Sequence, residues 1–321
     1  MEKPESAPMT DGGLNAENGA RAPRVSVIIP VWNGARSIPR VLASVFAQSF
    51  TDYEVVVVDD GSTDDTAAVL AGYQDRIHVI RQPNRGASTA RNAGVRASSG
   101  EYLAFLDDDD EWMEQMLARC VPVLDGDPAC ALVYTRTLTF DVQGRSLGTL
   151  DEQTGGFESP TMKQMLARPW NVVPSSFVVR RDVFNRCGGF HITGCEDRYF
   201  LLQAREHGPF RCVREPLLRK TEHPLYPTWL KREPRFKVFL SLLRERYGAS
   251  AEGLIRIHRS SRADLFKRTA RVLMKEGRPR DARRCLARVI HYQPASLRNY
   301  RKYLKTFLPS RVPSRTGDGK A

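Results

Sequence analysis

Four consecutive aspartates, Asp107 to Asp110, directly follow the apolar run YLAFL. Carboxylates this close repel one another, so the segment favours a bound cation or strong solvation around it. Oxygen ligands of this kind bind hard divalent cations such as Mg²⁺ or Mn²⁺. A divalent cation site is therefore the first hypothesis, and a solvated acidic turn that caps the next helix is the alternative.

Polar side chains also follow two earlier apolar runs. Pro30, Trp32 and Asn33 end or follow the run VSVIIP, and Asp59 and Asp60 follow the run VVVV. If the three runs are parallel strands, their polar ends meet at the carboxyl edge of one sheet, where ligands of α/β proteins bind. The sequence therefore predicts one ligand site built from three strand ends.

The elements that would position this site alternate between strand and helix. Residues 25–30, 55–58, 77–80 and 102–106 are short apolar runs without alternation, which is typical of strands covered on both faces. Helical patterns separate them, over residues 38–46, 62–73 and 86–98. This order predicts an α/β sheet with right-handed crossovers. Neither a dinucleotide-binding fingerprint nor a P-loop is present in the sequence.

After Trp112 the sequence no longer predicts a regular alternation. Residues 140–157 are typical of a hairpin followed by a mobile loop, and residues 171–190 of a strand and a helix that ends at Gly188-Gly189. Residues 194–208 form a further predicted helix. From about residue 225 the chain is expected to be helical, with a helix-turn-helix pair around Gly277.

Charge is divided unevenly along the 321 residues. Residues 211–321 contain 29 Lys and Arg against 9 Asp and Glu, a net charge of +20, whereas residues 1–210 have a net charge of −8. A basic segment is suited to bind phosphate, an anionic membrane surface or nucleic acid. The alternative is an ordinary solvated helix face that binds no ligand. Nucleic acid is disfavoured because no recognised nucleic-acid-binding motif is present. Peripheral membrane contact through the basic helices remains a hypothesis.

The composition also indicates the cellular compartment. The six cysteines form no C-x-x-C pair and no zinc-ligand spacing, so reduced thiols are expected. No run approaches the ~18 to 20 apolar residues that a membrane-spanning helix needs. The first 22 residues have no apolar core like that of a secretory signal and are expected to be disordered. These features predict a cytoplasmic protein.

Two long segments resemble the inverting family 2 glycosyltransferases, which have the GT-A fold. They are VSVIIPVWNGARSIPRVLASVFAQSFTDYEVVVVDDGSTDDT and NRGASTARNAGVRASSGEYLAFLDDDDEW. The similarity returns in Ser176-x-x-x-Arg180, in Gly188-Gly189-Phe190 and in Glu196-Asp197, and covers about two thirds of the chain. The resemblance implies a mixed, mostly parallel α/β sheet flanked by helices, with a C-terminal helical extension.

The resemblance also implies which residues bind the donor. Asp107 and Asp109 would be the D-x-D aspartates, with Asp109 the direct ligand of Mn²⁺ or Mg²⁺ and His223 a further metal candidate. The residues expected to contact the nucleotide sugar are Pro30, Trp32, Asn33, Asp59, Asp60, Arg91, Asp107 and Asp108. Trp32 departs from the tyrosine usual in the family. Its ring can stack on a base, and a buried packing role is the alternative.

The same resemblance implies which residues take part in catalysis. Asp197 would be the base that takes the proton of the acceptor hydroxyl, and Glu196 would orient it or bind the acceptor. In such an inverting transferase the metal and the diphosphate replace a general acid. The alternative is a surface helix start in which Asp197 pairs with Arg198 or Arg205.

The sequence thus predicts a metal-dependent glycosyltransferase of the hexosyltransferase type that uses a nucleotide sugar, with a UDP-sugar favoured, and a glycan or lipid-linked hydroxyl acceptor. A sugar-phosphate nucleotidyltransferase and a non-catalytic binding module are the alternatives. The expected division of the chain is a disordered lead over 1–22, the GT-A domain over 23–224, a basic helical region over 225–308 and a flexible tail over 309–321. The expected location is the cytoplasm, with peripheral contact at the inner membrane face.

Overall fold

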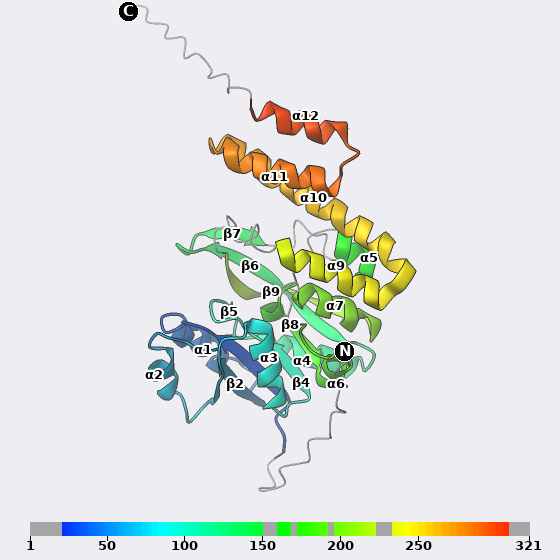
Figure 1. Cartoon of the computed structure of the whole chain (residues 1–321). Coiled ribbons are helices and arrows are strands. Elements are labelled where there is room, and N and C mark those ends of the chain that lie inside the picture. The colour runs from blue at the N-terminus through cyan, green and yellow to red at the C-terminus, as the bar shows by residue number, and fades with distance from the viewer. Residues whose placement is uncertain (1–20, 150–158, 168–171, 192–195, 223–232, 308–321) are drawn as a thin grey trace, which may run out of the picture.

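The computed structural model describes residues 21–149, 159–167, 172–191, 196–222 and 233–307, without the side chains of 196 and 233–236. Figure 1 shows the chain as a sheet flanked by helices, with further helices stacked at one end. The predicted disordered lead, apart from residues 21 and 22, and the predicted tail over 309–321 lie outside the described residues. Residues 150–157 of the hairpin and loop predicted over 140–157 also lie outside the described residues.

The first half of the sheet is parallel. Strand β1 pairs in parallel with β2 and with β4, and β2 pairs in parallel with β3. These strands are β1 (Val25–Val31), β2 (Tyr53–Asp59), β3 (His78–Arg81) and β4 (Tyr102–Phe105). They confirm the four strands predicted from the apolar runs. The register aligns Val31 with Asp59, so the polar residues that follow β1 and β2 begin at the same level.

Helices cover both faces of this half because neighbouring residues of a strand point to opposite faces. Ile28, Val56 and Val58 belong to one core cluster, and Val27 and Val57 belong to the other. The helices between these strands are α1 (Ile38–Phe46), α2 (Thr66–Ala71) and α3 (Ala87–Arg96). The predicted helices are therefore present, although α2 begins later than the predicted range.

Helix α3 lies very close to the sheet. A Cβ added at Gly94 would clash with Ile28 Cγ2 and would lie 3.2 Å from Val58 Cγ2. Glycine permits this approach because it has no side chain. Helix α3, which carries Arg91 near its middle, thus lies directly against β1 and β2.

The structure continues the strand-helix order beyond Trp112, where the sequence did not predict it. The elements of this part are β5 (Glu111–Trp112), α4 (Met116–Gly126), β6 (Leu132–Asp141), β7 (Ser146–Thr149), α5 (Met162–Ala167), β8 (Phe177–Arg180), α6 (Arg181–Arg186), α7 (Glu196–Glu206) and β9 (Phe210–Glu222). The hairpin predicted over 140–157 contains β7 and only the last two residues of β6, so most of β6 was not predicted. The predicted strand and helix over 171–190 correspond to β8 and α6.

Within the described residues, nine strands form one mixed sheet. The order is β3-β2-β1-β4-β8-β6-β9-β5, and β7 pairs with β6. Strand β8 is antiparallel to both β4 and β6, whereas β9 is parallel to β6. Strand β9 was missed because its sequence, FRCVREPLLRKTE, is rich in charged residues and contains a proline, both unusual within strands.

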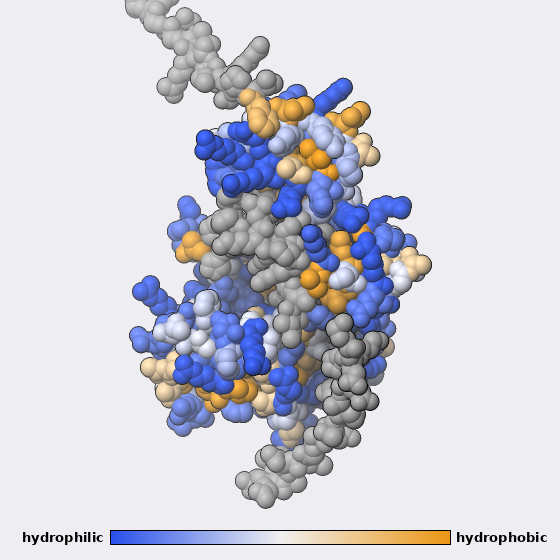
Figure 2. Space-filling view, in the orientation of Figure 1, coloured by the Kyte–Doolittle hydropathy of each residue, from blue (hydrophilic) through white to orange (hydrophobic). Residues whose placement is uncertain are grey.

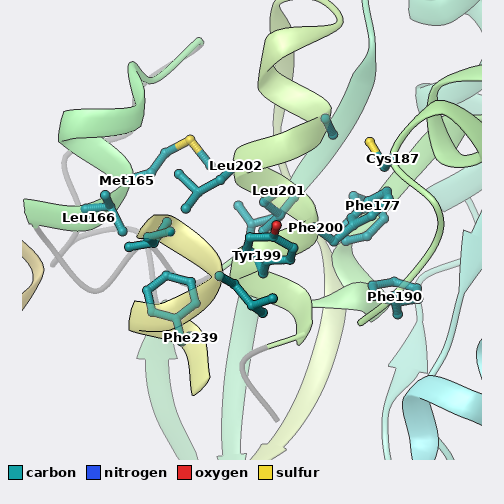
Figure 3. Close-up of a cluster of buried hydrophobic side chains, with 14 of the residues drawn as sticks. Met165, Leu166, Phe177, Cys187, Phe190, Tyr199, Phe200, Leu201, Leu202 and Phe239 are labelled. Carbon is teal, nitrogen blue, oxygen red and sulfur yellow. The ribbon is translucent and has the colours of Figure 1, made fainter. Parts of the chain in front are cut away.

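Aromatic side chains pack between α7 and the sheet. The rings of Phe190 and Phe200 have centroids 4.8 Å apart, and those of Phe177 and Phe200 are 5.9 Å apart and stacked. Figure 3 shows these side chains together with Tyr199 and with Phe239 of α9. Aromatic pairs at such distances add stability beyond the apolar area that they bury. The cluster links the second half of the sheet to the C-terminal helices.

The C-terminal part is helical, as predicted. It consists of α9 (Glu233–Tyr247), α10 (Ala251–Lys275), α11 (Pro279–Tyr292) and α12 (Leu297–Lys305). Gly277, with φ of +69°, lies in the turn between α10 and α11, which confirms the predicted pair. Figure 1 shows α11 and α12 at the end of the molecule away from α1, α2 and α3. In the described part of the chain, no helix is both long and apolar enough to cross a membrane.

Candidate functional site

A cavity of about 300 Å³ lies at the carboxyl ends of β1, β2 and β4. Its lining residues are Pro30, Val31, Trp32, Asp60, Ala87, Arg91, Asp107, Asp108 and Asp109. Seven of these nine were predicted from the sequence to contact a nucleotide sugar or a metal ion. The structure thus brings the three polar strand ends together, and the ligand that they would bind remains a prediction.

Trp32 has its side chain on the surface. The residue is 54% exposed, so the alternative of a buried packing tryptophan is wrong. Its backbone N–H lies 3.3 Å from Asp108 Oδ2 and donates a hydrogen bond to it. This bond ties the end of β1 to the segment after β4 and leaves the indole ring at the mouth of the cavity.

Asn33 positions two loops against each other. It has φ of +54°, a left-handed conformation that asparagine tolerates better than most residues. Its N–H donates to Ser62 Oγ (2.9 Å), and its side-chain oxygen accepts from the Thr63 N–H (2.8 Å). Asn33 is absent from the described lining of the cavity. Its hydrogen bonds give it a structural role, and its contact with a nucleotide remains a prediction.

Asp59 and Asp60 differ in what they face. Asp59 is buried, and its Oδ1 accepts the Ser62 N–H at 2.8 Å. Asp60 lines the cavity but accepts three hydrogen bonds from the segment before α3. The donors are the Gln82 side chain (2.7 Å), the Arg85 N–H (2.9 Å) and the Gly86 N–H (2.7 Å). Asp60 therefore holds the start of α3 in place, whether or not it also contacts a nucleoside.

Arg91 is buried beside the cavity and pairs with Asp107. Its Nη2 donates to Asp107 Oδ1, and its guanidinium carbon lies 5.4 Å from the centre of the Phe190 ring. Asn92 fixes the Phe190 backbone from the next position, with bonds of 2.8 and 2.9 Å. The planar donor group of Arg91 is thus held rigidly at the first aspartate of the run.

Burial and repulsion between carboxylates raise the pKa values of Asp108 and Asp110. Burial raises the pKa of Asp108 to about 6, and the neighbouring Asp109 and Asp107 carboxylates add to the shift. Asp110 is fully buried, and burial raises its pKa to about 7, although the Lys220 ammonium opposes this. Asp110 Oδ1 accepts the Thr221 N–H at 3.2 Å, and its Oδ2 has no hydrogen bond. The buried carboxyl group of Asp110 is therefore only partly compensated by its surroundings.

Strand β9 contributes two residues that sequence reasoning missed. Burial lowers the pKa of Lys220, but the Asp110, Glu222, Asp107 and Asp109 carboxylates raise it by more. Thr221 Oγ1 donates to the Asp109 carbonyl oxygen at 2.8 Å. In this stretch the sequence had pointed only to His223, as a metal candidate.

Two further polar side chains hold the aspartate segment in place. Ser175 Oγ accepts the Asp107 N–H at 3.1 Å, and Arg40 donates from its Nη2 to the Asp109 carbonyl at 3.4 Å. Because Ser175 lies 68 positions away in the chain, no local pattern could have identified it. Its neighbour Trp112 is anchored by an indole N–H bond of 2.7 Å to the Ser175 carbonyl oxygen.

The predicted catalytic pair begins α7. Asp197 is half-buried, and its Oδ1 accepts the Arg198 N–H at 2.7 Å. Arg198 Nη1 lies 3.2 Å from His258 Nδ1, and Arg205 donates to the Pro160 carbonyl oxygen. Asp197 is not among the described residues that line the cavity. The Glu196 side chain and all of His223 lie outside the described residues, so their roles stay predictions.

The aspartate run suits a divalent cation in charge and in ligand type. The unpaired Asp110 Oδ2 and the raised pKa values of Asp108 and Asp110 mean that negative charge on the buried carboxyl groups is unfavourable, which is compatible with a bound cation. Within the described ranges, however, no group of three or more His, Cys, Asp or Glu residues forms a metal site. Mg²⁺ is commonly held by one or two carboxylates together with substrate phosphates, so the two observations are compatible.

The fold and the polar cavity at its carboxyl edge define an α/β protein with a candidate ligand site at the ends of parallel strands. Residues 26–188, just over half of the chain, match the family described as Glycosyl transferase family 2. The chain therefore belongs to glycosyl transferase family 2. The predicted family is confirmed.

Relatives of known name match parts of the chain. Chondroitin synthase of Escherichia coli is 29% identical over 214 residues, which are 63% of this chain and 29% of that protein. Glycosyltransferase AglE of Haloferax volcanii is 32% identical over 194 residues, which are 58% of this chain and 62% of that protein. The chain thus spans less than two thirds of the length of either relative.

A solved structure extends the likeness to most of the fold. The crystal structure of S. aureus TarS 1-349 in complex with UDP-GlcNAc aligns with a TM-score of 0.63 at 20% identity. The alignment covers 88% of this chain and 91% of that chain, so it includes C-terminal helices. The predicted GT-A fold class is confirmed.

Proposed function

We propose that this protein is a metal-dependent inverting glycosyltransferase that moves a sugar from a UDP-sugar to a hydroxyl acceptor. The observation that carries the proposal is the cavity in which exposed Trp32 and buried Arg91 meet the aspartates 107–109. The family supports sugar transfer as the reaction type and argues against a nucleotidyltransferase. TarS, which has the same fold, was solved with UDP-GlcNAc, and this supports UDP as the nucleotide.

The donor would be held at both of its ends. The Trp32 ring at the cavity mouth can stack on a flat base, and a carboxylate oxygen of Asp60 can accept from a base or ribose donor. Arg91 is already paired with Asp107, so it would orient that carboxylate and contribute positive charge to the floor of the cavity. Lys220 would add positive charge from β9 beside the aspartates.

Mn²⁺ or Mg²⁺ would be held by Asp109, with Asp107 beside it, and would neutralise negative charge on the departing nucleoside diphosphate. The raised pKa values of Asp108 and Asp110 support such a cation. His223 is retained as a further ligand candidate.

Asp197 would accept the proton of the acceptor hydroxyl as its oxygen attacks the anomeric carbon of the donor. Attack from the face opposite the diphosphate inverts the configuration at that carbon. Asp197 is half-buried at the start of α7, and the Phe200–Phe190 contact connects this helix to the segment beside Arg91. Glu196 would orient Asp197 or bind the acceptor.

The acceptor class is proposed from the relatives. Chondroitin synthase and hyaluronan synthase, of Escherichia coli and Pasteurella multocida, are named for polysaccharides, which supports a role in polysaccharide or glycoconjugate synthesis. We place the reaction in the cytoplasm, where reduced thiols are stable, since Cys120, Cys130, Cys187 and Cys285 form no disulfide. Peripheral contact with the inner membrane face, through the basic C-terminal helices, is part of this proposal.

The first test is calorimetric binding of UDP, GDP and dTDP, each with and without Mn²⁺, to the wild type and to Asp109→Asn. We expect metal-dependent binding of UDP that Asp109→Asn loses. Asp264→Asn removes an exposed carboxylate of α10 and serves as the matched control, with unchanged binding. Failure of every nucleotide to bind under both conditions would leave a non-catalytic module as the better interpretation.

The second test addresses the base. Release of UDP from a panel of UDP-sugars should fall by about 10²-fold or more in Asp197→Asn, while UDP binding is retained. NMR of the released sugar should detect the anomer opposite to that of the donor. Full turnover in Asp197→Asn, or retention of configuration, would refute the proposed mechanism.

A further inference from the structure

Helix α12 presents its large apolar side chains to the surface. Leu297 is 76% exposed, Tyr300 40%, Leu304 62% and Phe307, just beyond the helix, 55%. Their spacing of three, four and three residues places all four on one face of the helix. A protein normally buries such a face, so this one is available to something outside the described chain.

The face of α12 that packs against the protein is instead mostly polar. Asn299 and Thr306 are buried, and Tyr303 packs partly against the core. Asn299 donates from Nδ2 to Gln293 Oε1 at 3.3 Å, and Thr306 Oγ1 donates to the Tyr303 carbonyl oxygen at 2.7 Å. The Asn299 bond reaches outside α12 and holds the helix in the orientation that exposes its leucines, whereas the Thr306 bond lies within the end of the helix. A rotation that buried the leucines would break the Asn299 bond.

Basic side chains occupy the third face of the same helix. Residues 297–307 contain Arg298, Arg301, Lys302 and Lys305 and no acidic residue. At 100° per residue, Arg301 and Lys305 lie directly beside Leu297 and Leu304. Figure 2 shows orange and blue side chains next to one another at the end of the molecule where Figure 1 places α12. The exposed surface is therefore apolar along one side and cationic along the other.

The charge decides which partner this surface fits. A second copy that packed the same surface against itself would bring four cationic side chains against four others, which is unfavourable. An anionic lipid surface is complementary on both counts, since its acyl boundary accepts the apolar face and its headgroups attract the cations. The net charge of +20 over residues 211–321 increases this attraction.

We propose that α12 docks on an anionic lipid surface, with Leu297, Tyr300, Leu304 and Phe307 inserted at the headgroup boundary and its basic residues against the headgroups. The inference names the surface that would make the peripheral contact included in the proposed function. It depends on neither the donor site nor the transfer reaction. It would place the enzyme beside a lipid-linked acceptor.

The test is flotation of the full chain with vesicles of phosphatidylcholine alone and of phosphatidylcholine with about 30% phosphatidylglycerol. We expect at least tenfold tighter binding to the anionic vesicles, and a marked loss of binding at high salt. The double variant Leu297→Ser/Leu304→Ser should weaken binding at least tenfold. Arg301→Gln/Lys305→Gln should weaken it by more than fivefold, since each basic residue near such a surface contributes a factor of about five.

Leu147→Ser is the control, because Leu147 is 58% exposed, close to the 62% of Leu304, but lies on β7, and it should bind within twofold of the wild type. Circular dichroism and thermal melting should show that each variant is folded. UDP binding and UDP-sugar hydrolysis without vesicles should be unchanged in all of them, so a failed donor site and a failed lipid surface give different results.

Three outcomes would overturn the inference. The first is equal binding to both kinds of vesicle or no binding to either. The second is unchanged binding in the leucine variant. The third is a dimer of the wild type, seen by sedimentation equilibrium, that Leu297→Ser/Leu304→Ser dissociates, since a second copy would then be the partner of this face.

Discussion

The Asp60 carboxylate offers a sharp test of how the site is supported. It is buried, and its two oxygens accept three hydrogen bonds from Gln82, Arg85 and Gly86. Asp60→Asn preserves the shape of the side chain but replaces one oxygen by an NH₂ group. Whichever oxygen is replaced, the new NH₂ group then faces another hydrogen-bond donor, either a backbone N–H or the Gln82 amide. The substitution therefore separates hydrogen bonding from side-chain size.

The expected cost follows from these bonds. The least damaging orientation keeps the remaining oxygen toward Gln82 and Arg85 and loses the Gly86 bond. A hydrogen bond to a charged group contributes about 1.5–3 kcal/mol, so the lost bond costs roughly 2 kcal/mol. The other two bonds change from charge-assisted to neutral and lose roughly 0.5 kcal/mol each. We expect the free energy of unfolding to fall by about 3 kcal/mol.

Urea denaturation followed by circular dichroism measures this change directly. Asp65→Asn, on the same loop, is the control: its side chain is exposed and makes no capping hydrogen bond, so a change within about 0.5 kcal/mol is expected. Wild-type stability in Asp60→Asn, combined with loss of UDP binding, would refute the reasoning. The carboxylate would then act mainly on the nucleoside and not on the segment before α3.

Two further predictions concern stability. Gly94→Ala should lower the free energy of unfolding by about 1–3 kcal/mol, because the new methyl group meets Ile28. Gly253→Ala, which has open space around it in α10, should raise the free energy of unfolding by roughly 0.5–1 kcal/mol. Thermal melts that rank the two variants the other way would contradict the close packing of α3. Burial, and then the nearby arginines, hold the pKa of His258 well below its usual value, so below about pH 6.5 the unfolded chain takes up a proton that the folded chain does not. The free energy of unfolding should therefore fall by up to about 1.4 kcal/mol per pH unit on acidification below pH 6.5. Denaturation curves at pH 7, 6 and 5 should give a smaller slope for His258→Gln. An equal slope in the wild type and the variant would contradict this role of His258.

The sequence by itself determined the first half of the sheet and most of the lining of the cavity. Strands β1 to β4 are short apolar runs with polar residues at their ends, and parallel strands bring such ends to one edge. Trp32, Arg91 and Asp107 could therefore be placed in one site from local patterns and from the family signature. The helix pair around Gly277 was equally predictable, because its apolar spacing and its glycine are local signals.

Only the tertiary structure decided what surrounds the aspartates. Lys220 and Thr221 reach them from β9, and Ser175 reaches Asp107 across 68 positions of the chain. Strand β9 is charged and contains a proline, so no periodic pattern marks it, and pairing with β6 makes it a strand. Likewise, periodicity identified the C-terminal helices, but only packing decides which face of α12 is buried, because its polar face forms hydrogen bonds inside and its leucines remain outside.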